Sequence, residues 1–388
     1  MFNLKTNLSI AKGALTKESP FYIQFFISNQ CFLKCRMCNI VAANRELKRV
    51  DLEQIEKIAC NLSKIGAGVV LLTGGEPFLR NDIVDIVRIF RQYGLTPRLQ
   101  TAGLLSRFDS MLECCELGAR DINVSLDTLD EELGDWINGS KGSWRRAIQT
   151  IGRITREFPA HDTVCAFGCV LSPYNIDHVE DVLDFADAIG WSLSLVPVHV
   201  NRTAREFHFR GYDKSFVFSP EDRKKIRALI ARIHQRKKNG DNIFDSEKYL
   251  DSIVSFAETG HPSWRHNGVC DSPNLYFAIR PDGRFAPCCD QDLEKPVYVY
   301  DENFPKIYKS RKFREQVRKV TAGCPGCNYG SYPEMTLTVR HFPTFVERVK
   351  LELSGGRLKH KAYSDEELFA LIEKIRKKRG HASSKPRI

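Results

Sequence analysis

The sequence alternates between short apolar runs and amphipathic segments, and this alternation constrains the fold more than any other feature. Six apolar runs have the length and composition of buried strands, at residues 21–28, 68–74, 97–103, 121–127, 164–171 and 192–198. Segments between them repeat their apolar residues every three or four positions, as amphipathic helices do, at 51–66, 81–94, 143–158 and 175–190. Asn81 and Ser143 are predicted N-caps, and Gly66, Gly94 and Gly190 are predicted helix stops.

Repeated strand and helix units predict a parallel sheet with right-handed crossovers. Six units are fewer than the eight that close a complete TIM barrel. We therefore expect an α/β fold, a partial (β/α)6 TIM-type barrel that is open on one side. Functional side chains should lie at the carboxyl ends of its strands, where such barrels place their sites.

Composition narrows the cellular setting and the role of the cysteines. The chain has 388 residues, of which 42% are hydrophobic and 27% charged, and no apolar run approaches the ~20 residues of a membrane span. Its first 20 residues lack the apolar core of a signal peptide, so we expect a cytoplasmic, reducing location. The 13 cysteines are then metal ligands, nucleophiles or core residues rather than disulfides. We expect the cysteines within helix and strand patterns to be packing residues: Cys60, Cys114, Cys115, Cys165 and Cys169.

Three cysteines, Cys31, Cys35 and Cys38, directly follow the first predicted strand in the spacing C-x-x-x-C-x-x-C. A structural zinc site normally uses four protein ligands, and its cysteines come in C-x-x-C pairs. Three thiolates in one short loop suit a four-iron cluster that keeps one iron open to a further ligand. The alternative is a loop of three cysteines without metal.

The second predicted strand ends in the sequence TGGEPFL, residues 73–79. Paired glycines after a strand let the backbone approach a ligand closely, and Glu76 with Pro77 forms a turn. Together with the preceding cysteine motif, this sequence resembles the radical S-adenosylmethionine (SAM) superfamily over residues of about 20 to 330. The resemblance implies a SAM-binding 4Fe-4S cluster on Cys31, Cys35 and Cys38 and a 5′-deoxyadenosyl radical that takes a hydrogen atom from a substrate.

The resemblance also implies cofactor-binding residues at the strand ends. By position, Gly74, Gly75 and Glu76 would contact the amino end of the SAM methionine. Ser125, in the SLD sequence of the fourth strand, resembles the family serine that contacts SAM. Asp127 is a further candidate nearby, with the alternative that it caps the next helix.

Three more positions are compared with the family pattern. Thr101 lies in TAG where relatives often read TNG, facing SAM or substrate, and Ala102 replaces the usual Asn. Met37 occupies the position before the third cysteine, where the family usually has an aromatic residue. We include Met37 and Thr101 among the predicted cofactor contacts.

A second cysteine group follows the predicted barrel. Cys270 and Cys288 flank a hairpin pattern with a turn at 281–283, and Cys324 and Cys327 form a C-x-x-C pair. Spacing alone favours zinc. The pattern, however, resembles the twitch form of the SPASM extension of radical SAM enzymes, which implies one auxiliary 4Fe-4S cluster on these four cysteines. Cys289 is the alternative to Cys288, and the glycine-to-cysteine spacing of the family favours Cys288.

The charge is concentrated at the end of the chain. Residues 340–388 hold 13 Lys and Arg against six Asp and Glu, which is most of the net charge of +10. Two amphipathic helices are predicted there, at 341–356 and 363–380, the second opened by a capping box of Ser364 and Glu367. The basic end could bind an anionic membrane surface or an acidic partner, or be a solvated helix face; no aromatic and basic interleaving favours nucleic acid.

These patterns divide the chain into four predicted parts: an N-terminal segment (1–18), the radical SAM partial barrel (19–245), a small α+β auxiliary-cluster domain (246–330) and a basic helical extension (331–388). We expect a net oxidation or bond-forming modification of a non-peptide metabolite, lipid-linked if the tail binds membranes, with a flavodoxin- or ferredoxin-type reductant. One alternative is the maturation of a ribosomally made peptide, which the short segment before the first strand disfavours because it lacks room for a leader-binding domain. Another is a non-catalytic iron-sulfur electron carrier.

Overall fold

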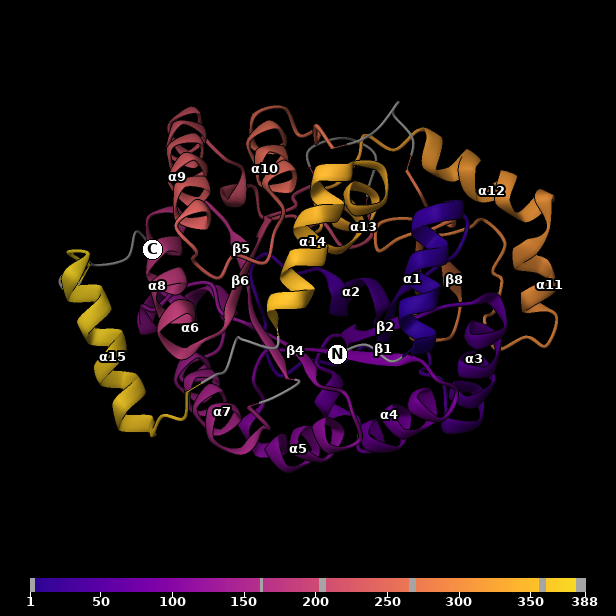
Figure 1. Ribbon diagram of the computed structural model, residues 1–388, viewed down its shortest axis with the longest axis horizontal. Coiled ribbons are helices and arrows are strands. Elements are labelled where there is room, and N and C mark those ends of the chain that lie inside the picture. Colours follow the sequence, from indigo (N-terminus) through magenta and orange to yellow (C-terminus); the bar gives the residue numbers. More distant parts are fainter. Residues whose placement is uncertain (1–3, 161–162, 202–206, 265–269, 356–360, 382–388) are drawn as a thin grey trace.

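The computed structural model describes residues 4–160, 163–201, 207–264, 270–355 and 361–381. Figure 1 shows a curved sheet surrounded by helices, with the last helix on the outside of the molecule. The architecture is mixed α/β, as the alternating pattern predicts.

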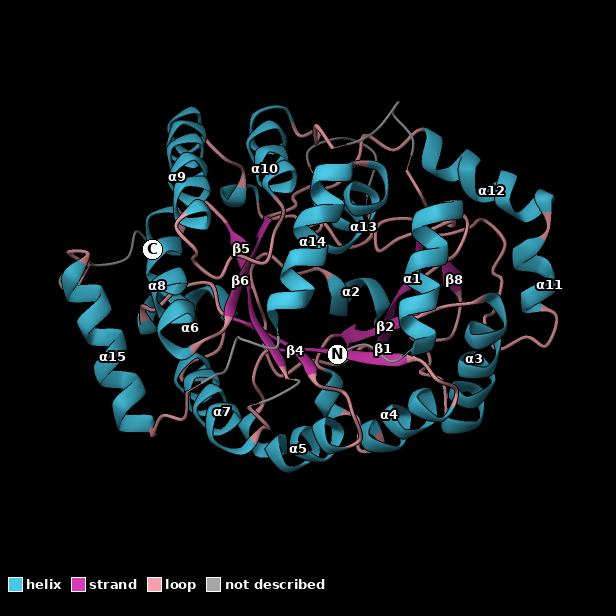
Figure 2. Ribbon diagram, viewed as in Figure 1, coloured by secondary structure: helices cyan, strands magenta, loops and turns pink. Residues whose placement is uncertain are grey.

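One eight-stranded sheet forms the centre of the molecule (Figure 2), in the order β6-β5-β4-β3-β2-β1-β7-β8. The strands are β1 (Tyr22–Ser28), β2 (Val69–Gly74), β3 (Thr96–Thr101), β4 (Asp121–Ser125), β5 (Val164–Leu171), β6 (Ser192–Pro197), β7 (Tyr276–Ile279) and β8 (Phe285–Ala286). Strands β1 to β6 are parallel, which confirms the partial barrel. Strand β7 adds a parallel neighbour to β1, and β8 pairs with β7 as an antiparallel hairpin. The sheet is therefore continuous across the domain boundary that the sequence predicts at residue 245.

The helices of the barrel and its extensions are bounded as follows. They are α1 (Leu4–Thr16), α2 (Ile40–Asn44), α3 (Leu52–Ile65), α4 (Ile83–Gln92), α5 (Phe108–Glu116), α6 (Glu131–Asn138), α7 (Ser143–Glu157), α8 (Val179–Ile189), α9 (Pro220–Lys238), α10 (Glu247–Thr259), α11 (Phe304–Lys309), α12 (Arg311–Ala322), α13 (Ser331–Arg340), α14 (Phe342–Gly355) and α15 (Asp365–Lys378). Single 3-10 turns occur at η1 (Pro77–Leu79), η2 (Leu105–Arg107), η3 (Ile176–His178) and η4 (Lys214–Phe216).

The glycines predicted to end helices lie at helix C-termini, whereas both predicted N-cap residues are wrong. Gly66 and Gly190 end α3 and α8 in the left-handed conformation, with φ of 85° and 78°. Asp82 rather than Asn81 is the N-cap of α4, and Gly142 rather than Ser143 that of α7. Neither cap makes a side-chain hydrogen bond, so the polar residue in the sequence did not mark the start.

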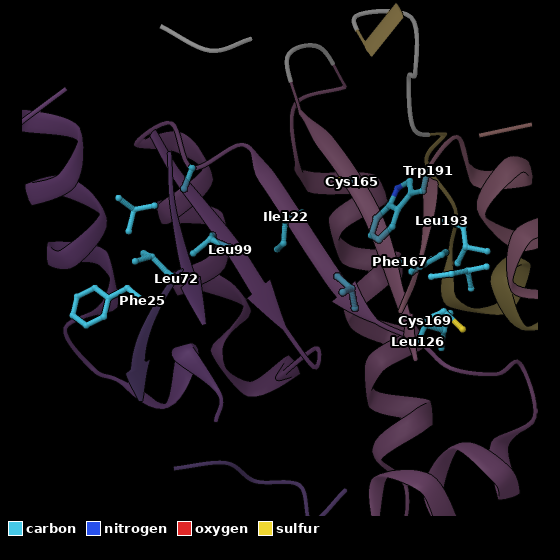
Figure 3. Packing of buried hydrophobic residues seen from close by; sticks show 14 of the residues in the cluster. Phe25, Leu72, Leu99, Ile122, Leu126, Cys165, Phe167, Cys169, Trp191 and Leu193 are labelled. Atoms are coloured by element: carbon cyan, nitrogen blue, oxygen red, sulfur yellow. The ribbon is translucent and has the colours of Figure 1, made fainter. Parts of the chain in front are cut away.

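The larger apolar core lies between the sheet and the outer helices. Figure 3 shows Phe167, Trp191 and Leu193 of this core near strands β5 and β6, and the Phe167 and Trp191 ring centroids are 4.8 Å apart. Cys165 and Cys169 are 6% and 0% exposed and belong to the same core, as do Cys114 and Cys115. Their predicted packing role is confirmed.

The C-terminal extension folds back onto the barrel. Helix α13 lies against α1 and α14, and Tyr22 Oη in β1 is 2.9 Å from Ser331 Oγ at the start of α13. Helix α15 begins with the predicted capping box of Ser364 and Glu367, and it packs against α7 and α8 through Leu368, Ile372 and Ile375. In Figure 1 it lies at the left edge beside α8. Within the described residues, no helix has the combination of length and hydropathy that a membrane span requires.

The basic end of α15 differs from the free cationic tail that the sequence suggested. Arg376 contacts Asp130, and Arg379 Nε is 2.8 Å from Asp184 Oδ2. Because these two arginines are paired with barrel carboxylates, less positive charge remains for an external anionic surface. One face of α15 is buried, while Lys374, Lys377 and Lys378 are exposed on the helix, as the alternative of a solvated basic face predicts.

Candidate functional site

The loop that carries Cys31, Cys35 and Cys38 begins three residues after the end of β1, at the carboxyl edge of the sheet. Its backbone is held by α6 and the turn after it, because Lys34 N donates to Asn138 O and Arg36 N to Ile137 O, both at 3.0 Å. Arg36 also lies over the Trp136 ring, 4.4 Å from its centroid. The loop is thus fixed in position by a helix that the sequence analysis did not connect with it.

The three thiols lie close enough to affect one another's ionisation. Burial raises the pKa of Cys31 to about 11, and the charges of Glu76 and Cys38 add to the effect. Burial also raises the pKa of Cys35, with further contributions from Cys38, Asp127 and Cys31. Thiolates in this loop therefore need a compensating cation, which an iron cluster supplies. The donor set fits a cluster held by three cysteines.

The glycines of the TGGEPFL sequence lie against the residues that precede Cys31. Gly75 N donates to Ser28 O at 2.9 Å, and Glu76 N donates to Gln30 O at 2.7 Å. A Cβ atom on Gly75 would lie 2.0 Å from Gln30 O, and one on Gly74, where φ is 136°, would lie 2.3 Å from Ser28 O. Only glycine permits this close approach, which sets the cysteine loop beside the end of β2.

Glu76 is fully buried and joins the ends of β2 and β3. Its carboxylate accepts hydrogen bonds from Thr101 Oγ1, Ala102 N and Phe78 N at 2.9 to 3.1 Å. Burial raises its pKa to about 7, and the three hydrogen bonds oppose that rise. The hydroxyl of Thr101 therefore donates a hydrogen bond to Glu76. Ala102, which lacks the Asn side chain usual in the family, donates its backbone N–H to the same carboxylate.

The remaining predicted contacts surround the same loop. Ser125 ends β4 and is exposed, while its neighbours Val124 and Leu126 are buried, so its side chain faces the barrel interior. Asp127 accepts from Val170 N at 2.7 Å, and burial raises its pKa to about 7. The alternative that Asp127 caps the next helix is wrong, because Asp130 is the N-cap of α6. Met37 packs at the edge of the main core.

The second cysteine group comes together from three separate segments. Cys270, Cys288, Cys324 and Cys327 line one small cavity with aromatic residues, namely Trp264, Tyr276 and Tyr332. Burial raises the pKa of Cys270 to about 12, and Cys270 Sγ is 3.2 Å from Tyr276 Oη. The donor set again suits a metal group, because four thiols share one cavity and no cationic side chain is among the described residues that line it.

Cys288 and Cys289 differ in their surroundings. Cys289 does not line the cavity. The hydrogen bond between the two thiols lowers the pKa of Cys288, whereas burial raises the pKa of Cys289. Arg280, fully buried on the hairpin, donates to Cys289 O at 3.0 Å and to Gln291 O at 3.1 Å. This arrangement supports Cys288 as the metal ligand. Cys289 instead contributes its backbone carbonyl as an acceptor for Arg280.

Residues 198–201 and 207–211 contact neighbours of both cysteine groups. Asn39, next to Cys38, donates to His208 O at 2.8 Å. Asn328, next to Cys327, donates its N–H to His199 Nε2 at 2.9 Å, and the rings of His199 and Tyr329 stack at 3.8 Å. Arg210 pairs with Asp290 at 2.8 Å. The sequence analysis missed these residues; the only signal was their position after the last predicted strand, where barrels place functional loops.

Comparison with known proteins agrees with this geometry. Residues 25–186 match the model of the radical SAM superfamily. A probable GTP 3′,8-cyclase of Pyrococcus abyssi is 30% identical over 226 residues, covering 56% of this chain and 70% of the relative. The PqqA peptide cyclase of Bradyrhizobium diazoefficiens is 27% identical over 168 residues, covering 43% of each chain.

Two solved structures have a similar fold. Streptococcus suis SuiB bound to S-adenosylmethionine aligns with a TM-score of 0.59 and 16% identity, covering 80% of this chain and 71% of that one. The AdoMet-bound anSMEcpe aligns with a TM-score of 0.58 and 17% identity, covering 84% and 98%.

The chain belongs to the radical SAM superfamily. It is accordingly an enzyme of the class that uses a 4Fe-4S cluster and SAM, and not a non-catalytic electron carrier.

Proposed function

We propose that the enzyme takes a hydrogen atom from a substrate C–H bond in the barrel mouth and completes a net oxidation or bond-forming modification through an auxiliary 4Fe-4S cluster. The observation that carries this proposal is the cavity shared by Cys270, Cys288, Cys324 and Cys327. Four thiols in one cavity can saturate a four-iron cluster and leave no iron open for substrate. Electron transfer is the chemistry left to such a centre.

The first site would hold the SAM-binding cluster on Cys31, Cys35 and Cys38. When bound, the cluster and SAM supply the 5′-deoxyadenosyl radical that becomes 5′-deoxyadenosine on taking the substrate hydrogen. The residues of the chain hold and orient SAM: Gly75 keeps the backbone of β2 against the cysteine loop, and Glu76 offers a fixed carboxylate. Ser125 and Asp127 complete the rim on β4. Met37, Gly74 and Thr101 remain proposed contacts.

The oxidation balances with the groups present. The substrate would lose one hydrogen atom to the deoxyadenosyl group, one electron to the auxiliary cluster and one proton to water, and the auxiliary cluster would pass its electron on to the external flavodoxin- or ferredoxin-type carrier. His208 O and His199 Nε2 accept hydrogen bonds from Asn39 and Asn328, next to the two cysteine groups, which supports a substrate position between these groups. An external reductant of the flavodoxin or ferredoxin type would supply the electron that starts each turnover.

We propose a polar, non-peptide metabolite as the substrate. Along β4, Ile122 and Val124 belong to the helix-facing core, so Asn123 and Ser125 face the barrel interior. Asn123 Oδ1 is buried and has no hydrogen-bond partner among the described residues. Such an acceptor supports a ligand that donates hydrogen bonds inside the barrel. The lipid-linked form of the substrate loses support, because Arg376 and Arg379 are paired within the molecule.

A peptide substrate is the second candidate. A relative is named for a peptide, PqqA, and SuiB and anSMEcpe are also titled with bound peptides at TM-scores of 0.58 and 0.56. These structures share only 16% identity with the chain, so they support the fold and leave the substrate open to test.

The deciding experiment is anaerobic iron-sulfur reconstitution, reduction with dithionite or a flavodoxin system, and addition of SAM. We expect 5′-deoxyadenosine to form, and one metabolite from a small-molecule extract to be consumed only in the presence of enzyme and SAM. Consumption of a peptide from a size-selected peptide pool would instead establish the second candidate. Failure to form any 5′-deoxyadenosine with a full iron complement would contradict the proposal.

A further inference from the structure

A second type of metal-binding arrangement lies outside the barrel mouth, where the end of α15 meets the start of α8. It consists of His178, Asp181 and His381, whose candidate ligand atoms all lie within 4.8 Å of one another. His178 ends η3, Asp181 is in the first turn of α8, and His381 follows α15. Two of these residues are therefore three positions apart at one helix start, and the third is 200 residues away in the chain.

The docking of α15 brings His381 to this position. His381 Nδ1 is 2.7 Å from Asp181 Oδ2, and its ring stacks on that of His178 with centroids 4.9 Å apart and an interplanar angle of 28°. Arg376 Nη2 also donates to His381 O at 3.1 Å, which fixes the chain at that residue. The cluster is thus built by tertiary packing and not by a local run of sequence.

Two features of the cluster suit it to bind a cation. Asp181 is 0% exposed, and its Oδ1 atom has no hydrogen-bond partner among the described residues; the nearest cation, Arg379 Nε, is 3.6 Å away. His178 is also largely buried, at 9% exposed. A buried imidazole and a buried carboxylate oxygen without a hydrogen bond are both suited to coordinate a metal.

The surrounding charge also leaves room for a divalent cation. The ion pairs around the cluster join six carboxylates to four guanidinium groups: Asp130, Glu180, Asp181, Asp184, Asp187 and Asp241 with Arg232, Arg236, Arg376 and Arg379. The carboxylates therefore outnumber the guanidinium groups by two, and a divalent ion would add positive charge there.

We propose that His178, Asp181 and His381 bind one divalent transition-metal ion, zinc above all, which fastens the C-terminal helix to the barrel. Two imidazole nitrogens and a carboxylate oxygen are a common zinc set, with water as the fourth ligand. Zinc with bonds of about 2.0 to 2.2 Å places its ligands roughly 3.4 Å apart, so ligand atoms separated by up to 4.8 Å must approach by about 1.4 Å on binding. Thr128 Oγ1, 3.3 Å from His178 Nδ1, would orient that ring from outside.

This site is independent of the radical chemistry, so its test is independent too. Full-length protein with its cysteine sites loaded with iron is treated anaerobically with EDTA and then titrated with Zn²⁺ and, separately, with Co²⁺. We expect one zinc ion per chain, a zinc-dependent rise in the thermal unfolding midpoint, and a cobalt spectrum without a sulfur-to-cobalt charge-transfer band. The last readout separates this site from any vacant cysteine.

Three variants decide the assignment. H178A and H381A should each weaken zinc binding by about 100-fold or more, since even outer partners of metal ligands contribute 10- to 100-fold. H234A is the matched control, because His234 makes a surface contact of 2.9 Å with Asp251, and it should bind zinc as the wild type does. H381N, which keeps a polar side chain without the imidazole, should also lose binding.

Two results would overturn the proposal. One is the absence of zinc binding by the wild-type protein, or equal binding by H178A and H381A, which would show only adventitious metal. The other is an equal loss of thermal stability in H381A with EDTA and with zinc, which would show that His381 and Asp181 form an ion pair and nothing more.

Discussion

The two cysteine groups differ in how the chain builds them. Cys31, Cys35 and Cys38 lie within eight residues of sequence, on one loop held by the end of β2 and by α6. Cys270, Cys288, Cys324 and Cys327 come from three segments and meet only when the hairpin β7–β8 and the segment after α12 are in place. The first group therefore needs a barrel to orient it, whereas the second needs tertiary structure to exist at all. A metal at the second site should contribute more to folding than one at the first.

The largest effect is expected from replacing Cys31, Cys35 and Cys38 together by Ala. The proposed SAM-binding cluster would be lost, so iron should fall from about eight to about four atoms per chain and 5′-deoxyadenosine formation should cease. Unfolding should stay cooperative, because the loop is held by backbone hydrogen bonds at both ends. Full iron content in the triple variant would contradict the assignment of a cluster to these three cysteines.

Replacing Cys324 and Cys327 by Ala should separate the two roles. We expect product formation to be lost while SAM cleavage continues, because the barrel and its first loop are intact. The thermal midpoint should fall further than in the triple variant, since the second site joins distant segments. Iron and 5′-deoxyadenosine are measured on the same sample. Equal loss of cleavage and product would assign the second group to folding alone.

Cys288 and Cys289 provide a matched pair within the second group. C288A should lose about four irons, while C289A should keep about eight, since only Cys288 lines the cavity. The lowered pKa of Cys288 makes its thiolate the more accessible of the two at neutral pH. Iron analysis and the visible absorption of the reconstituted variants check this assignment, and the reverse pattern would transfer the ligand role to Cys289.

At the first site, Gly75→Ala should reduce SAM cleavage by about 100-fold, the cost of a displacement of about 1 Å near reacting groups. Its Cβ would lie 2.0 Å from Gln30 O, so the cysteine loop must move. G240A is the control for backbone strain without a clash, because Gly240 has a φ of 102° and nothing lies within 4 Å of a Cβ there. Iron at the second site should be unchanged in both variants. Wild-type rates in G75A would mean that the close approach is not needed for SAM binding.

The smallest effect is expected at His199. H199A removes the acceptor of Asn328 N–H and the ring that stacks on Tyr329, but no proposed ligand. We expect roughly a tenfold loss in the ratio of product to 5′-deoxyadenosine and a shifted midpoint potential of the second cluster. H199Q, which can still accept a hydrogen bond, should recover part of the loss. An unchanged potential would assign His199 to packing only.

The same contrast explains what the sequence could predict. The strands, the barrel class and the first cysteine loop depend on local patterns, and the predicted strand limits differ from the observed ones by at most two residues at either end. The choice of Cys288 over Cys289 depended on the spacing in the family. The cavity adds a geometric reason for it, because Cys288 and not Cys289 is among its lining residues. His199, Arg210 and Asp290 were missed because their partners are distant in sequence. Arg376 and Arg379 looked like free cations because their carboxylate partners lie on other helices.

The pairing of β7 with β1 has a consequence for the order in which the molecule can form. Strand β1 carries the first cysteine loop, and its outer edge is covered only by a strand that begins at Tyr276. During synthesis, that edge stays unpaired until more than half of the chain has emerged, and unpaired edges recruit other strands. A nascent chain would therefore be exposed to misassociation at the very strand on which its iron chemistry depends. Completion of the hairpin ends that exposure.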